Sequence, residues 1–79
     1  MEYDRDKVDE AVLALLWLTT FQERGQHDKR AWKGQDWKVL DRLHAKGLIG
    51  DPKGKAKSVS FTDEGSRRSE ELFRQLFKS

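Results

Sequence analysis

The groups with the clearest chemical use in this chain are the basic side chains of its middle part. Residues 24–60 hold ten basic and four acidic side chains, a net charge of +6. Residues 1–23 carry −4 and residues 61–79 are balanced, which gives +2 for all 79 residues. Lysine and arginine gathered on one segment favour a polyanionic partner. The alternative is a solvated surface that serves only solubility.

Three of these cations are expected on one helix, which covers residues 37–46 and has Asp36 as its N-cap. The predicted apolar face of this helix consists of Trp37, Leu40, Leu43 and His44. The opposite face holds Lys38, Asp41, Arg42, Ala45 and Lys46. Gly47 is expected to end the helix in the left-handed conformation, with Leu48 placed to touch Leu43.

Two short strands around a turn are predicted between residues 48 and 61. Residues 48–50 form an apolar step, residues 51–54 have turn chemistry, and Val59 and Phe61 alternate with two serines. Three lysines lie on or beside the turn: Lys53, Lys55 and Lys57. Such side chains suit phosphate contacts, and they also protect a sheet edge from aggregation, so both interpretations stay open.

The first helix is expected over residues 6–24, with Asp6 as its N-cap and Gly25 at its end. Its large apolar side chains are distributed around the whole circumference, so all of its faces need cover. Either a second chain covers one face or the short domain wraps the helix by itself. A homodimer is favoured, and its candidate interface residues are Leu13, Trp17, Phe21, Leu72, Phe73, Leu76 and Phe77.

Residues 25–35 form a polar connection with room for one helical turn that begins at Asp28. The last helix is expected to begin with Thr62 as its N-cap and to end at about Phe77. The tryptophans at positions 17, 32 and 37 are core candidates, with base stacking as an alternative use of Trp32. The predicted fold class is therefore mainly α with a small β-hairpin, in the order helix, short turn, helix, hairpin, helix.

Catalytic and metal-binding chemistry find no support in the residue pattern. Cysteine is absent, and two histidines, His27 in a polar loop and His44 on an apolar helix face, do not make a metal site. No Ser/His/Asp set, pair of carboxylates or phosphate-cradling glycine loop stands at a suitable spacing. We expect a protein that is not an enzyme and takes no cofactor or metal.

Length and composition favour one small domain over residues 1–79. Charged residues make up 38% and hydrophobic residues 35%, a lean core that a partner chain would help to complete. The apolar run of residues 11–18 is too short to cross a bilayer, and the acidic segment before it is unlike an export signal. We expect a cytoplasmic location without membrane contact.

Residues 40–49, followed by residues 59–65, resemble the second half of winged-helix regulators of the MarR and PadR type. In those families a helix that ends in a Lys-Gly-Leu-Ile-like step is the recognition helix, and the hairpin after it is the wing. A Leu-Thr-x-x-Gly-like step then opens the following helix. The resemblance covers residues 37–72. It implies a winged-helix-like fold in which one helix and one hairpin approach duplex DNA.

The resemblance implies a small dimeric protein that binds duplex DNA as a regulator or accessory factor. Lys38, Arg42 and Lys46 then face the major groove, and the lysines of the wing contact phosphates. The chain is also similar to a group of small bacterial proteins of unknown function, in which the segments 30–34 and 54–58 recur. The alternative class is a protein-interaction or self-association module on the same scaffold, without DNA binding.

Overall fold

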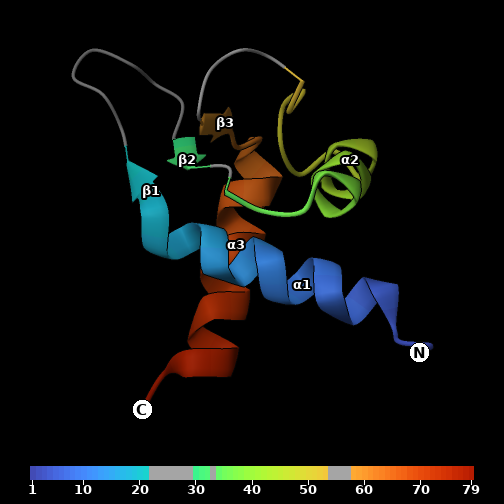
Figure 1. Cartoon of the computed structure of the whole chain (residues 1–79). Coiled ribbons are helices and arrows are strands. Elements are labelled where there is room, and N and C mark those ends of the chain that lie inside the picture. Colours follow the sequence, from blue (N-terminus) through green and yellow to red (C-terminus); the bar gives the residue numbers. More distant parts are fainter. Residues whose placement is uncertain (22–29, 33, 54–57) are drawn as a thin grey trace.

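The computed structural model of the chain describes residues 1–21, 30–32, 34–53 and 58–79 (Figure 1). Within these ranges it contains three α-helices, one 3-10 turn and three short strands. Helices α1 and α3 cross each other, α2 lies beside α1, and the small sheet packs above their crossing (Figure 1). The expected class, mainly helical with a small antiparallel sheet, is confirmed.

Helix α1 spans Arg5–Leu16 and is shorter than predicted. Its N-cap is Asp4, whose carboxylate accepts the N–H of Lys7 at 3.2 Å, so the expected start at Asp6 is two residues late. The expected continuation to Arg24 is wrong, because the 3-10 turn η1 (Trp17–Thr19) and strand β1 (Thr20–Phe21) follow α1 directly. The hydroxyls of Thr19 and Thr20 donate to the carbonyl of Leu16, and β-branched threonines favour a strand over a helix.

The end of α1 is completed by a hydrogen bond from α3 (Asp63–Phe77). The N–H of Trp17 donates to the carbonyl of Ala14, three residues back, as a tightened last turn requires. The carbonyl of Leu13, which an α-helical Trp17 N–H would have reached, accepts the hydroxyl of Ser69 at 2.6 Å instead. Ser69 is fully buried, so this bond joins the two helices at their crossing.

The sheet has the order β1-β2-β3 and is antiparallel throughout. Strand β2 (Arg30–Trp32) lies in the segment where a helical turn was predicted, so that prediction is wrong for these residues; Asp28, Lys29 and Lys33 lie outside the described residues. Ala31 pairs with Thr20 on one side and Val59 on the other. Arg30 donates to Ser58 Oγ at 2.8 Å and to the Ser58 carbonyl at 3.0 Å. Pairing on both edges therefore outweighs the local helical preference.

Helix α2 spans Trp37–Ala45 and begins where the sequence predicts. The Asp36 carboxylate accepts the N–H groups of Lys38 and Val39 at 2.8 and 3.4 Å. Gly47 has a φ of 75°, and the N–H of Leu48 donates to the carbonyl of Leu43 at 3.1 Å, so the predicted C-terminal motif is confirmed.

The buried arc of α2 differs from the predicted apolar face. It consists of Val39, Leu40 and Leu43, whereas Trp37 and His44 are exposed. The arc is centred between Val39 and Leu40, which at 100° per residue puts Trp37 and His44 at its margin. Trp37 therefore is not the core residue that its size suggests.

The predicted hairpin is present in a reduced form. Strand β3 (Ser58–Ser60) is regular, but its expected partner at residues 48–50 contributes only the isolated bridge between Ile49 and Phe61. The N–H of Gly50 donates to the carbonyl of Ser60 at 2.9 Å, beside that bridge. Val59 and Phe61 are buried, which confirms the predicted alternation.

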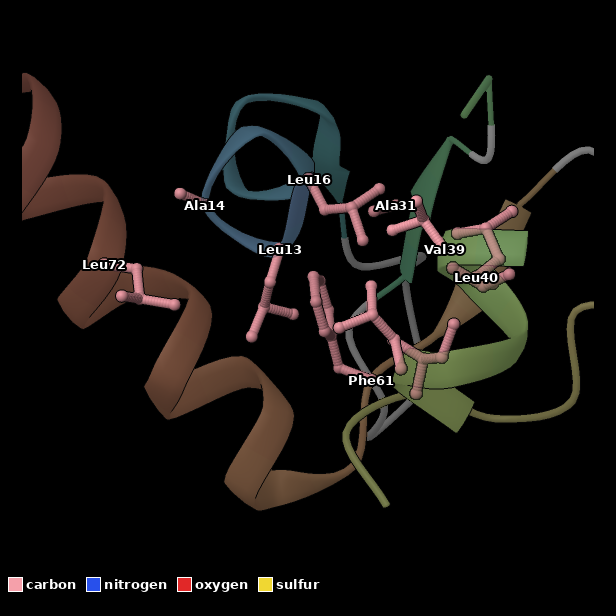
Figure 2. Packing of buried hydrophobic residues seen from close by; sticks show 11 residues of the cluster. Leu13, Ala14, Leu16, Ala31, Val39, Leu40, Phe61 and Leu72 are labelled. Atoms are coloured by element: carbon pink, nitrogen blue, oxygen red, sulfur yellow. The ribbon is translucent and has the colours of Figure 1, made fainter. Parts of the chain in front are cut away.

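The core is one cluster in which leucines of all three helices meet the buried residues of β2 and β3 (Figure 2). It contains Leu13, Ala14, Leu16, Ala31, Val39, Leu40, Leu43, Ile49, Val59, Phe61 and Leu72. Leu13 and Leu72 were predicted at a dimer interface, and this is wrong for both, because each is almost fully buried inside its own chain. One face of α1 is thus covered by α3 and the sheet of the same chain. None of the helices in the described ranges has the length and apolar character that crossing a membrane demands.

The close approach of α3 to the end of α2 requires a glycine at position 65. A Cβ built on Gly65 overlaps the backbone carbonyl of Leu48, which has no room to move because Thr62 and Leu48 are hydrogen-bonded. Gly65→Ala is expected to lower the free energy of unfolding by about 1–3 kcal/mol, the usual cost of overpacking. Urea denaturation followed by circular dichroism measures this change.

Gly34→Ala is the matched control, because a Cβ at Gly34 has nothing within 4 Å. Its effect is expected to stay within about 0.5 kcal/mol. Equal stability of the two variants would contradict the inferred contact.

Candidate functional site

The strongest polar contact in the described residues joins α1 to α2 through a buried carboxylate. Asp9 on α1 is 1% exposed. Arg42 donates Nε to both of its oxygens at 2.9 Å and Nη2 to Oδ1 at 2.7 Å. Lys46 donates Nζ to Oδ2 at 3.0 Å and also contacts Asp6 at 3.1 Å. A buried charge is tolerated only with partners of this kind, so the contact fixes α2 against α1.

Hydrogen bonding keeps this network charged over the neutral pH range. The Arg42 guanidinium holds the pKa of Asp9 below its ordinary value of 3.8, although burial acts in the opposite direction. In return, Asp9 raises the pKa of Lys46 above 10.5. The three groups therefore behave as one ionic unit at neutral pH.

This network changes the predicted cationic surface of α2. Of its three candidate nucleic-acid contacts, Lys38 is exposed and forms no salt bridge within the described ranges. Arg42 and Lys46 instead turn toward α1, where Asp9 and Asp6 balance their charge. Arg42 is therefore 29% exposed and Lys46 40% exposed, but both are paired with acids of α1, which the sequence did not predict. The net charge of −4 on residues 1–23 was the signal that could have indicated this pairing.

An open hollow lies where the N-terminal residues and α1 meet the start of α2. Its volume is about 600 Å³, and three cations line it: Arg5, Lys38 and Arg42. The remaining lining residues are Met1, Tyr3, Val8, Asp36 and Val39. We call this the N-terminal hollow. Sequence reasoning missed Tyr3 and Arg5, because the packing of α1 against α2 brings them beside Lys38.

The lysines predicted on the wing are described only in part. Lys53 is exposed, and its N–H donates to the Asp51 carboxylate at 2.9 Å, as the predicted turn requires. Lys55 and Lys57 lie outside the described residues.

A second surface feature is an apolar end formed by η1 and the last turns of α3. Leu18, Leu76 and Phe77 are 66%, 55% and 50% exposed. Phe73 packs partly on the core and its ring centroid lies 5.2 Å from that of Phe77. Trp17 lines a shallow hollow of about 280 Å³ with Phe73, Arg74 and Lys78. We call this group the apolar end; the side chain of Phe21 is outside the described part of the molecule.

His44 has a structural contact in the turn that follows α2. The Nδ1 of His44 lies 3.1 Å from the carbonyl of Ile49, so this ring helps to close the turn after α2. His27 belongs to the undescribed segment 22–29. Across the described ranges no three His, Cys, Asp or Glu side chains are close enough to hold a metal ion.

Comparison with known proteins gives a family but no activity. Residues 4–79 match the family model described as a domain of unknown function, DUF6429. The chain belongs to this family. It is also 64% identical over 77 residues to the uncharacterised protein y4hR of Sinorhizobium fredii (strain NBRC 101917 / NGR234), covering 98% of this chain and 97% of that protein. The predicted likeness to small bacterial proteins of unknown function is thereby confirmed. No solved structure matches the chain.

Removing the buried charge tests the role of Asp9. Asp9→Asn is expected to lower the free energy of unfolding at neutral pH by about 2 kcal/mol, within the range for a hydrogen bond to a charged group. Because the folded pKa of Asp9 is below 3.8, its stabilisation is present above pH 3.8 and is lost as the pH falls through the lower folded value. Urea unfolding at several pH values measures both effects.

The wild type should lose this stability in acid, and Asp9→Asn should not show that component of the loss. Asp6→Asn, which removes the exposed partner of Lys46, is the control and is expected to change stability little. Parallel acid profiles for wild type and Asp9→Asn would contradict the assigned role.

Proposed function

We propose that the protein binds nucleic acid through the face that contains the start of α2. The observation that carries this proposal is the convergence of Arg5, Lys38 and Arg42 on one open hollow. Arg5 and Lys38 have no salt-bridge partner among the described residues, so their charge is available to a polyanion. The lining favours a binding role over a catalytic one, because its cations outnumber its one carboxylate, Asp36, which already accepts the N–H groups at the start of α2.

The sequence supports the same ligand class beyond the hollow. Residues 24–60 keep a net charge of +4 after Arg42 and Lys46 are paired with acids of α1, since ten cations less two face four acids. Lys53, Lys55 and Lys57 supply three of the remaining eight. The resemblance to winged-helix regulators favours duplex DNA as the form of nucleic acid, α2 as the recognition helix and β3 as one strand of the wing. A cytoplasmic regulator or accessory factor is part of this proposal.

Fluorescence anisotropy with a labelled random duplex at low salt tests the proposal. Lys38→Ala is expected to weaken binding severalfold and to lower the slope of log affinity against log salt by about one. The triple change of Lys53, Lys55 and Lys57 to Ala should lower that slope by about three if each lysine contacts a phosphate.

Arg67→Ala is the control for this experiment, because Arg67 is an exposed cation on α3 that lines neither the N-terminal hollow nor the apolar end. It should leave the affinity for duplex unchanged. Affinity that is indifferent to salt, or equal losses in Lys38→Ala and Arg67→Ala, would contradict the assignment of the binding face.

A second candidate function is self-association, and the apolar end favours it. Exposed apolar side chains scattered singly are ordinary, but Phe77 lies beside Phe73, which lines one hollow with Trp17. The exposed Leu18 and Leu76 belong to the same two elements, η1 and α3, which contact each other. A homodimer that covers this group is compatible with nucleic-acid binding, because the N-terminal hollow involves other residues. Without any affinity for nucleic acid, it becomes the whole function as a protein-interaction module.

Leu76→Asp tests self-association, since a carboxylate cannot be buried unpaired in an apolar interface. The substitution is expected to weaken a dimer at least tenfold in sedimentation equilibrium, while the monomer stays folded because Leu76 is exposed. Gln75→Asp introduces the same charge at an exposed position on the same helix and should have little effect. A wild type that sediments as a monomer at high micromolar concentration would remove this candidate.

A further inference from the structure

We propose that the N-terminal hollow holds one unpaired nucleotide, with its phosphate on the cations and its base against Tyr3. This inference rests on the proposed nucleic-acid function and specifies which part of the ligand enters the site. A volume of about 600 Å³ is within the range of sites that enclose small ligands. The same chemistry is offered by a free mononucleotide and by a nucleotide within a single strand.

One of the cations that line the hollow, Arg42, has a guanidinium whose orientation is fixed by Asp9. Asp9 accepts from Nε and Nη2 of Arg42, whereas Nη1 makes no hydrogen bond within the described residues. The side chain of Arg42 is 29% exposed, so this outer edge is open to the hollow. Arg5 and Lys38 add two exposed cations from different segments. Charged donors of this kind form the strong hydrogen bonds by which proteins hold phosphate oxygens.

The rest of the lining is apolar and aromatic. Tyr3 is 59% exposed, and Met1, Val8 and Val39 are its apolar members. A ring beside a cationic groove is the combination that binds unpaired bases by stacking. The backbone of a duplex would use only the cations, because its bases are stacked inside the helix and out of reach of Tyr3. The joint presence of cations and an aromatic ring in one hollow therefore points to an unpaired nucleotide.

One acid, Asp36, also lines the hollow, and it serves as the N-cap of α2. The carboxylate of Asp36 accepts the N–H groups of Lys38 and Val39 at the start of α2. Its charge is partly offset by the positive end of that helix. Because Arg42 is paired with Asp9, the two unpaired cations Arg5 and Lys38 against this one carboxylate leave the hollow positive overall.

Anisotropy with a labelled short oligothymidine, on the full chain at low salt, tests the proposal. Tyr3→Ala is expected to weaken binding about tenfold through loss of base stacking, and Tyr3→Phe should restore it to within about twofold. Arg5→Ala should weaken binding and lower the salt slope by about one. Arg67→Ala, an exposed arginine on α3 outside the hollow, is the matched control. Tyr3 and Arg5 are both exposed, so these variants are expected to fold normally.

Unlabelled competitors separate the sources of the ligand. Displacement of the oligothymidine by a mononucleotide at far lower concentration than inorganic phosphate supports a base contact, and equal potency of the two overturns it. If Tyr3→Ala and Arg5→Ala bind the strand as the wild type does while Lys38→Ala loses duplex affinity, the nucleotide site is wrong and the proposed function stands. If a mononucleotide binds through Tyr3 and Arg5 but no strand or duplex binds, the site stands and the proposed function is wrong. No binding of any probe overturns both.

Discussion

The structure depends on the burial of one carboxylate between two helices. Asp9 has no access to water, and an isolated charge in that position would be strongly unfavourable. Arg42 and Lys46 supply the compensating charges from successive turns of α2, and Arg42 does so with a two-pronged contact whose geometry admits one orientation. Helix α2 buries three side chains, and two of them are Leu40 and Leu43. The packing of these leucines and the ionic contact together determine the position of α2.

The same contact relates the fold to the candidate site. By occupying one edge of Arg42, Asp9 leaves the opposite edge at the N-terminal hollow, next to Lys38 and Arg5. The charge of Lys46, one turn further on, is balanced by its salt bridges to Asp6 and Asp9 of α1. The three cations are spaced four residues apart in the sequence, but their roles differ. Lys38 is exposed, Arg42 has one edge that is not bound to Asp9, and Lys46 pairs with the acids of α1.

Local rules predicted the parts of the fold that local interactions determine. The caps at Asp36 and Thr62, the left-handed Gly47 and the alternation of Val59 and Phe61 all depend on neighbours within a few residues. The end of α1 and the existence of β2 depend on partners far along the chain, namely Ser69 and the strand at Ser58–Ser60. The pattern of apolar residues in α1 does not reveal these distant partners, so the helix was predicted to be too long.

The candidate site follows the same division. Lys38 could be identified from its position on the helix, since its exposure follows from helical periodicity. The involvement of Tyr3 and Arg5 could not, because it requires the packing angle between α1 and α2. The sequence predicted Trp17, Phe73, Leu76 and Phe77 of the apolar end as interface residues. It also included Leu13 and Leu72, which are core residues, because hydrophobicity alone does not distinguish a buried residue from an exposed apolar one.

The hydroxyl of Ser69 on the Leu13 carbonyl has a consequence for how the domain is assembled. The point at which the first helix gives way to β1 is set by a residue of the last helix, so the two ends of the chain share one structural boundary. Ser69 thus links the segment just before Thr20, where the sheet begins, to the C-terminal helix. Loss of this link is expected to destabilise the helices and the sheet together, in keeping with the cooperative unfolding of small single domains.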